Sequence, residues 1–192
     1  PIIGIDNRHT LNEVEFNNVR VPVANRIGEQ DKGWTYAKAL LQHERTAIAG
    51  VAESKRHVRE LKALAAQTMA NGQPLTEDAA FRRNISDIEI ELMALEYTEL
   101  RVLAATASGS APGAESSLLK IKGTEIQQAI QKLRMDLAGY YMGTQVLTGD
   151  NNSGHDFADR ARIDYMYGRA ATVYGGSNEV QKNIISKFVL GL

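Results

Sequence analysis

The residue whose position most strongly suggests chemistry is Glu44. The residues around it repeat an apolar pattern with spacings of three and four, and the place after Leu40 and Leu41 holds this carboxylate. A glutamate on the buried face of a helix is costly unless it is paired, protonated or used, and burial raises a carboxyl pKa from about 4.3 toward the range that suits a general base. The alternative is that Glu44 faces solvent or bonds a buried helix end. The apolar pattern consists of Ala37, Leu40, Leu41, Ala47, Ile48, Val51 and Val58.

A glycine turn at residues 174–178 is the second candidate. Two consecutive glycines, Gly175 and Gly176, precede a helix whose N-cap is Ser177 or Asn178. Glycine lets a ligand approach the backbone, and the free amides at a helix N-terminus bind anionic or carbonyl oxygen. The alternative is an ordinary capped turn between two helices.

The sequence offers no pattern typical of a metal centre. The segment His43-Glu44-Arg45-Thr46-Ala47 lacks the second histidine of a zinc-protease helix. No Glu-x-x-His pair occurs, which argues against a di-iron carboxylate bundle, and the chain has no cysteine. We therefore expect no metal site.

Composition narrows the class of protein. The net charge is −1, with 22 basic and 23 acidic residues and no basic stripe among aromatics, so a nucleic-acid partner is not expected. No apolar run is long enough to span a membrane, and we expect no membrane association. The absence of cysteine fits a reducing compartment, and we expect a cytoplasmic protein. Hydrophobic residues make up 43% and aromatic residues only 6%, a mixture that favours helices.

The first thirty residues differ from the rest. Residues 11–22 alternate apolar and polar side chains and end at Pro22, a pattern typical of a strand. A single strand leaves its backbone groups unpaired, so we interpret residues 1–30 as the tail of a β-domain and a linker, with the other strands upstream.

Residues 31–192 are predicted to form an all-α bundle. Helices are expected at 34–69, at 76–108, through 119–137, at 157–170 and at 179–190. The third of these has apolar residues on more than one face, namely Leu118, Leu119, Ile121 and Ile130, so we expect at least a dimer. Lys120, Lys122 and Glu125 are predicted to form its solvated face.

Three motifs stand out along the chain, namely Gly33-Trp34, His43-Glu44-Arg45-Thr46, and Tyr174-Gly175-Gly176-Ser177-Asn178-Glu179-Val180-Gln181-Lys182-Asn183-Ile184-Ile185. Together they resemble the C-terminal part of the acyl-CoA dehydrogenase family, and the last is similar to bacterial pimeloyl-CoA dehydrogenase-like subunits. The resemblance implies a four-helix domain with a short C-terminal helix, preceded by a helical and a β-domain. It also implies FAD as cofactor, an acyl-CoA substrate, electron-transfer flavoprotein as electron acceptor, and a homo- or hetero-oligomer. The chain alone is then expected to be inactive and to bind FAD poorly.

In this family a glutamate removes the α-proton of the thioester while FAD accepts the β-hydrogen as hydride. Many members place that glutamate directly after the tyrosine of the terminal motif, where this chain has Gly175. Others place it on the first long helix before an arginine, which here gives Glu44 and Arg45 as the catalytic pair. The resemblance assigns the cofactor-binding residues as Tyr174, Gly175, Gly176, Ser177 and Glu179.

Three positions depart from the family pattern. An arginine that holds the FAD pyrophosphate of a neighbouring subunit is replaced by Thr68, and two glutamines used by relatives fall near Ala79 and Asp136. A hetero-oligomer in which only some interfaces hold FAD would explain this. The alternative functions are a non-catalytic or structural subunit of the same fold, and a plain helical interaction module.

Overall fold

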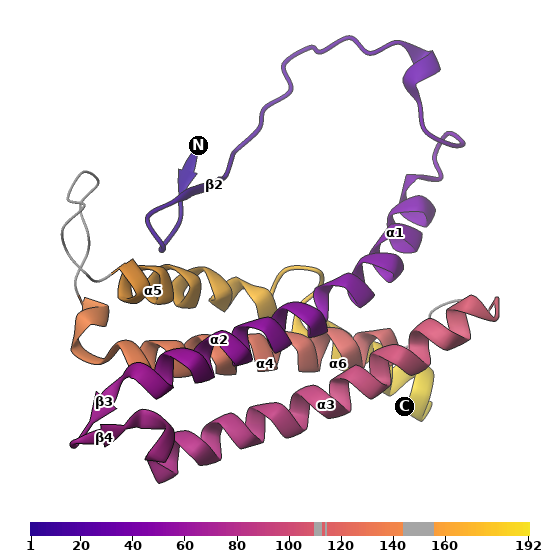
Figure 1. Ribbon diagram of the computed structural model, residues 1–192. Helices are drawn as coiled ribbons and strands as arrows, with labels where there is room; N and C mark the ends of the chain where they lie inside the picture. Colours follow the sequence, from indigo (N-terminus) through magenta and orange to yellow (C-terminus); the bar gives the residue numbers. More distant parts are fainter. Residues whose placement is uncertain (110–112, 114, 144–155) are drawn as a thin grey trace.

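The computed structural model describes residues 1–109, 113, 115–143 and 156–192, and it describes residues 42–47, 115 and 156 by their backbone alone. Within these ranges the protein is a layered bundle of helices, from which the N-terminal segment and the first helix project (Figure 1). The expected all-α fold class is confirmed.

The N-terminal segment holds a short hairpin. Strand β1 (Ile2–Ile3) pairs antiparallel with β2 (His9–Leu11), and the chain then runs without a strand to a 3-10 turn, η1 (Val23–Asn25). The strand predicted for residues 11–22 is therefore wrong beyond Leu11. Its residues are exposed, and no strand of the described chain lies alongside to accept their backbone hydrogen bonds.

The helix predicted for residues 34–69 is two helices, α1 (Gly33–Ile48) and α2 (Val51–Gln67). The break is at Gly50, whose φ of 59° lies in the left-handed region that favours glycine. After α2 a hairpin of β3 (Met69–Ala70) and β4 (Gln73–Pro74) turns the chain at Asn71 and Gly72.

Helix α3 (Ala79–Ala107) follows the 3-10 turn η2 (Leu75–Glu77), and its N-cap is Asp78. The carboxylate of Asp78 accepts a hydrogen bond of 2.8 Å from the backbone amide of Phe81. The apolar residues of this helix that recur at spacings of three and four, as expected for a packed bundle, form its core face. Its buried residues are Phe81, Ile85, Ile88, Leu92, Leu95 and Val102.

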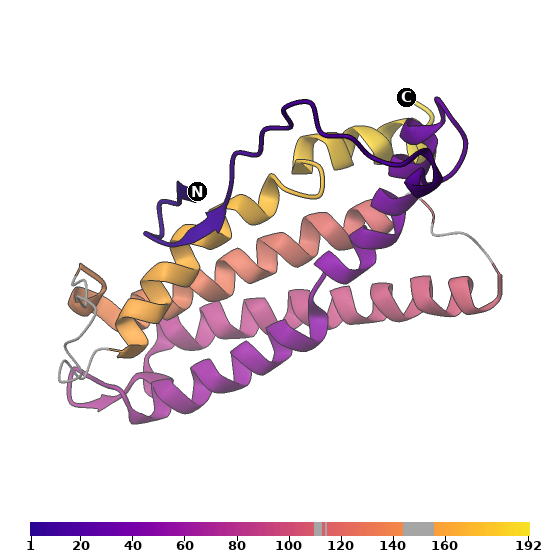
Figure 2. The same cartoon turned by 90° about the horizontal axis from the view of Figure 1, so that it is seen from above.

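Helix α4 (Glu115–Ala138) is the centre of the bundle and packs against α1, α2, α3, α5 and α6. After η3 (Gly139–Gly143) come α5 (Asp156–Gly168), η4 (Arg169–Thr172) and α6 (Asn178–Ile185). The helix expected at 179–190 changes at Ser186 into a π-helical turn, η5 (Ser186–Leu190). Figure 2 shows α4 lying between the α2–α3 layer and the α5–α6 layer.

Burial on α4 differs from the expectation in two ways. Lys120, predicted to be solvated, is fully buried, whereas Lys122 is partly exposed and pairs with Glu91 at 3.1 Å. Of the apolar residues taken as a second face, Ile121 and Ile130 are buried and Leu118 alone is exposed. The large exposed apolar side chains lie on α3 instead. They are Ile90, Met93, Tyr97, Leu100 and Leu103.

Candidate active site

The glycine turn lies where η4 gives way to α6. Gly175 and Gly176 have φ values of 67° and 85°, both in the left-handed region, so each position requires glycine for unstrained backbone. Ser177 caps α6, since its hydroxyl accepts from the amide of Val180 at 3.4 Å, as predicted. Gly176 is exposed, so the backbone of the turn is open to a ligand.

Gln181 fixes this turn from its buried side. Its side-chain amide donates to the carbonyl oxygens of Gly175 at 3.0 Å and Gly176 at 3.4 Å, and the residue is fully buried. A Cβ built on Gly176 would lie 2.6 Å from Gln181 Nε2, so the glycine also allows this close approach. The two carbonyls are thereby directed into the protein, and the turn is fixed by a side chain of the helix that follows it.

Lys120 anchors the start of α6 to α4. Its Nζ donates to Asn178 Oδ1 at 2.9 Å, and Thr124 Oγ1 lies 3.5 Å from the same oxygen. Burial lowers the pKa of the Lys120 ammonium, and Glu179 opposes that shift by attraction. The sequence prediction of a solvated lysine was wrong because the buried partner, Asn178, is 58 residues away in the chain.

The pKa values of two side chains at the turn, the Glu179 carboxylate and the Tyr174 phenol, are shifted in opposite directions. Hydrogen bonds from its own backbone amide and from Ser177 lower the pKa of the exposed Glu179, with help from Lys182 and Lys120. Burial raises the pKa of the Tyr174 hydroxyl, which is therefore neutral near pH 7. Glu179 is thus an anion beside the turn, and this charge disfavours a second anion there.

The C-terminal end of α1 reaches the glycine turn. A Cβ built on Gly175 would lie 2.5 Å from Ile48 Cδ1, so the Ile48 side chain packs directly against that glycine. The predicted catalytic residues, Glu44 and Arg45, lie on α1 about one turn before Ile48, and their side chains are outside the described part of the structure. The structure therefore places the end of their helix against the glycine turn and describes these two residues by their backbone alone.

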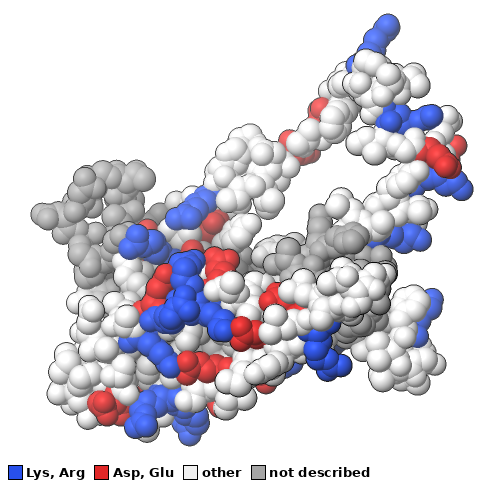
Figure 3. Space-filling model, turned by 45° about the vertical axis from the view of Figure 1, so that its right-hand side comes forward, with Lys and Arg blue, Asp and Glu red and all other residues white. Residues whose placement is uncertain are grey.

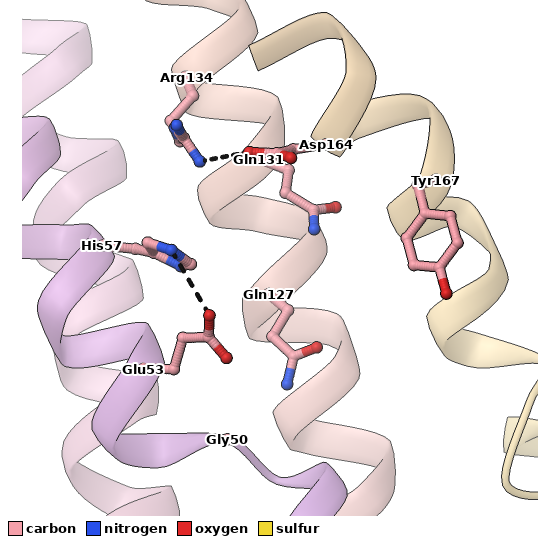
Figure 4. Close-up of a pocket in the computed structure, with 8 residues that line it drawn as sticks. All are labelled: Gly50, Glu53, His57, Gln127, Gln131, Arg134, Asp164 and Tyr167. Carbon is pink, nitrogen blue, oxygen red and sulfur yellow. Dashed lines mark hydrogen bonds and ion pairs between the residues drawn. The ribbon is translucent and has the colours of Figure 1, made fainter. Parts of the chain in front are cut away.

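A polar pocket of about 250 Å³ opens between α2, α4 and α5, away from the residues that the sequence singled out (Figure 4). Arg134 pairs there with Asp164 at 2.9 Å, and Arg56 donates to His57 Nε2 at 3.0 Å beside it. No local sequence pattern indicates this pocket, because its lining residues come from three different helices. The residues are Gly50, Glu53, His57, Gln127, Gln131, Arg134, Asp164 and Tyr167.

The three positions that depart from the family pattern have other roles here. Thr68 closes the end of α2 by donating from its hydroxyl to Leu64 O at 2.9 Å. Ala79 is the first residue of α3, and Asp136 pairs with Lys132 at 2.7 Å. None of these three side chains is a cation that could hold a pyrophosphate.

Charges on the face shown in Figure 3 are mixed in sign. Pairs between helices include Lys55 with Glu96 and Lys62 with Glu89, each at 2.6 Å. No helix among the described residues is both long enough and apolar enough to cross a bilayer. Those residues also hold no group of three or more side chains suited to a metal ion.

Comparisons with known proteins agree with this fold. The family model for the acyl-CoA dehydrogenase C-terminal domain matches residues 31–190. Acyl-CoA dehydrogenase FadE26 of Mycobacterium tuberculosis is 31% identical over 92% of this chain and 44% of its own length. Acyl-CoA dehydrogenase IpdE1 of the same organism is 30% identical over 100% of this chain and 46% of its own length.

Solved structures give the same result. A chain of the ChsE4-ChsE5 complex from Mycobacterium tuberculosis superposes with a TM-score of 0.74 at 31% identity, covering 92% of this chain and 45% of that one. Butyryl-CoA dehydrogenase from Megasphaera elsdenii superposes with a TM-score of 0.72 at 19% identity, covering 91% and 43%, which is a likeness of fold alone.

Fold and comparisons together define a helical-bundle domain of the type found in acyl-CoA dehydrogenases. The chain belongs to the acyl-CoA dehydrogenase family and matches its C-terminal domain. It spans about half the length of the curated relatives FadE26 and IpdE1. The family predicted from the sequence motifs is confirmed, while the finer likeness to pimeloyl-CoA dehydrogenase-like subunits stays a prediction.

Proposed function

We propose that this chain is the C-terminal domain of an FAD-dependent enzyme that removes two hydrogens across the α and β carbons of an acyl-CoA thioester, with Glu44 as the base. The observation that carries the proposal is the contact between Ile48 and Gly175. Position 44 precedes Ile48 by four residues on the same helix, so both lie on one face about 6 Å apart along the axis. Because Ile48 lies against Gly175, we propose that this face is the one directed to the glycine turn.

The base and the turn have separate tasks in this proposal. Glu44 takes the α-proton as a carboxylate, and Arg45 orients neighbouring groups. FAD, when bound, accepts the β-hydrogen as hydride. Gly175 leaves vacant the position from which many relatives supply the base, so α1 is the element left to provide it.

The turn is suited to hold part of the flavin. Gln181 directs the carbonyls of Gly175 and Gly176 inward, and the exposed backbone of Gly176 carries no side chain that would block a flat ligand. Tyr174, Ser177 and Glu179 border the same surface and are assigned to cofactor binding. The pyrophosphate finds no cation at Thr68, so that part of FAD must be held by residues elsewhere.

We further propose that the enzyme works as an oligomer, and a hetero-oligomer is favoured. The exposed apolar stripe on α3, from Ile90 to Leu103, repeats at three- and four-residue spacings that suit helix packing. One similar chain belongs to the ChsE4-ChsE5 complex. A partner that supplies the arginine missing at Thr68 would complete one FAD site, and electron-transfer flavoprotein is the proposed acceptor.

The test is Glu44→Gln in the full-length enzyme. Loss of a general base lowers turnover by about 10²–10⁴-fold, while fold and flavin content stay those of the wild type. Glu53→Gln, a matched change on the next helix, is the control and should leave turnover near the wild-type value. Wild-type turnover in the Glu44 variant would instead place the base elsewhere, whereas an absence of turnover in the flavin-loaded wild-type protein would favour the non-catalytic subunit.

A gain-of-function variant sharpens this test. Adding Gly175→Glu to the Glu44→Gln enzyme places a carboxylate where many relatives have one. The substitution must adopt a φ of 67° and displace Ile48 Cδ1, so only partial recovery of turnover is expected. Full flavin content with no recovery would show that this position cannot reach the substrate in this protein.

A further inference from the structure

The end of α1 is held by one side chain of α4. Gln127 Nε2 donates to the carbonyl oxygen of Ile48 at 2.9 Å and lies 3.3 Å from that of Ala49. The last carbonyls of an α-helix have no partner within the helix, so they need a donor from elsewhere. Gln127 is partly buried and supplies that donor where α1 breaks into α2.

Two further contacts fix the same point. Gly123, one turn before Gln127 on α4, allows Ala49 to approach so closely that a Cβ there would lie 2.6 Å from Ala49 Cα. On the other side, Ile48 packs against Gly175. The end of α1 is therefore located between α4 and the glycine turn, and among these three contacts Gln127 provides the hydrogen bonds.

In the part of α1 whose side chains are described before residue 48, the large apolar side chains of Trp34 and Leu40 are 70% and 60% exposed. These two side chains therefore add little restraint to the direction of the helix. A small change in the direction of α1 at its C-terminal end moves position 44, about four residues earlier on the helix, relative to the glycine turn. In proton transfer a displacement of about 1 Å can cost on the order of 10²-fold in rate.

We infer that Gln127 is a positioning residue for the α-proton transfer, an inference that rests on the proposed function of Glu44. It acts through the carbonyls of Ile48 and Ala49, and it sets where α1 presents position 44 to the glycine turn. The general acyl-CoA chemistry does not require this residue, which touches neither substrate nor cofactor in this scheme.

The neighbouring residue provides a matched control. Gln128 Nε2 donates to Gly168 O at 3.0 Å and lies 3.5 Å from Arg169 O, so it holds the end of α5 by the same kind of bond. Gln127→Leu and Gln128→Leu each remove one side-chain amide from the same helix. A purely structural role predicts the same behaviour for both variants.

The experiment measures both variants in the full-length flavin-loaded enzyme. Gln127→Leu should lower kcat by about 10–100-fold with little change in KM, and it should raise the kinetic isotope effect of an α-deuterated acyl-CoA. Gln128→Leu should lower the melting temperature by a similar amount and keep kcat and the isotope effect near wild type. Gln127→Lys, whose ammonium can donate to carbonyls at a helix C-terminus, should recover part of kcat.

Equal losses of kcat in the two leucine variants, or a wild-type isotope effect in Gln127→Leu, would overturn the inference. Should that variant fail to fold, Gln127→Met keeps the unbranched shape and takes its place with the same expected results. The outcome for Glu44→Gln separates the two proposals. If that variant keeps wild-type turnover the proposed base is wrong, and if it loses turnover while Gln127→Leu does not, the positioning role alone is wrong.

Discussion

Helices α1 and α2 are two halves of one run of helix-forming sequence, and they differ in what covers them. In α2 the apolar face is core, with Val51, Val58 and Leu61 each no more than 4% exposed. In α1 Leu40 is 60% exposed, and the helix extends beyond the bundle (Figure 1). Stability and the proposed chemistry are therefore divided between the halves, since α2 holds the bundle together and α1 carries the candidate base.

The largest expected effect is a difference between α2 and α1 in how much a leucine-to-alanine change lowers the free energy of unfolding. Leu61→Ala removes a core side chain from α2 and should lower the free energy of unfolding by about 2–5 kcal/mol. Leu40→Ala on α1 makes the same chemical change at an exposed site and should alter it by about 0.5 kcal/mol or less. Urea unfolding of residues 1–192 measures both. Equal losses would show that α1 is part of the core and contradict the division.

A smaller effect is expected at the junction. Gly123→Ala places a Cβ 2.6 Å from the Cα and carbonyl oxygen of Ala49, which are backbone atoms and cannot rotate away. The strain should lower the free energy of unfolding by about 1–3 kcal/mol. The control is Gly33→Ala, since nothing lies within 4 Å of a Cβ at that position. If the alanine at 123 is tolerated like the one at 33, α4 does not hold the break.

The smallest expected effect concerns pH and the pocket beside α2. Burial lowers the pKa of His57 below 6.5, Arg56 and Arg134 lower it further, and Glu53 and Glu60 oppose the shift. The unfolded chain then binds the proton more readily, so stability is complete above about pH 6.5 and declines as the pH falls through the folded pKa. Thermal unfolding of His57→Gln should show a shallower acid decline than the wild type. Parallel curves would mean that His57 is not the group responsible.

The sequence was a good guide to the α3 core because its apolar spacing repeats over 29 residues and needs no partner to be identified. The break at Gly50 was missed, since a single glycine within a helix costs only about 1 kcal/mol and is compatible with continuation. The strand beyond Leu11 was wrong because pairing depends on strands that the described chain does not supply.

Part of the candidate site was predictable and part was not. The cap at Ser177 is local, so sequence sufficed. The burial of Lys120 and the bond from Gln127 to Ile48 join residues 58 and 79 positions apart, and no local pattern reveals them. In the sequence, Gln127 and Gln128 look like part of an ordinary polar face of α4. Their role becomes clear only when the helix ends that they contact are known.

The central claim is that α1 delivers Glu44 to the glycine turn as the base, and single-turnover flavin reduction tests it most directly. The full-length enzyme is mixed with an acyl-CoA substrate, and the loss of oxidised flavin absorbance is followed in wild type and Glu44→Gln. The account predicts flavin reduction slower by about 10²–10⁴-fold in the variant, at unchanged flavin content. Reduction at the wild-type rate would contradict it and place the base outside α1.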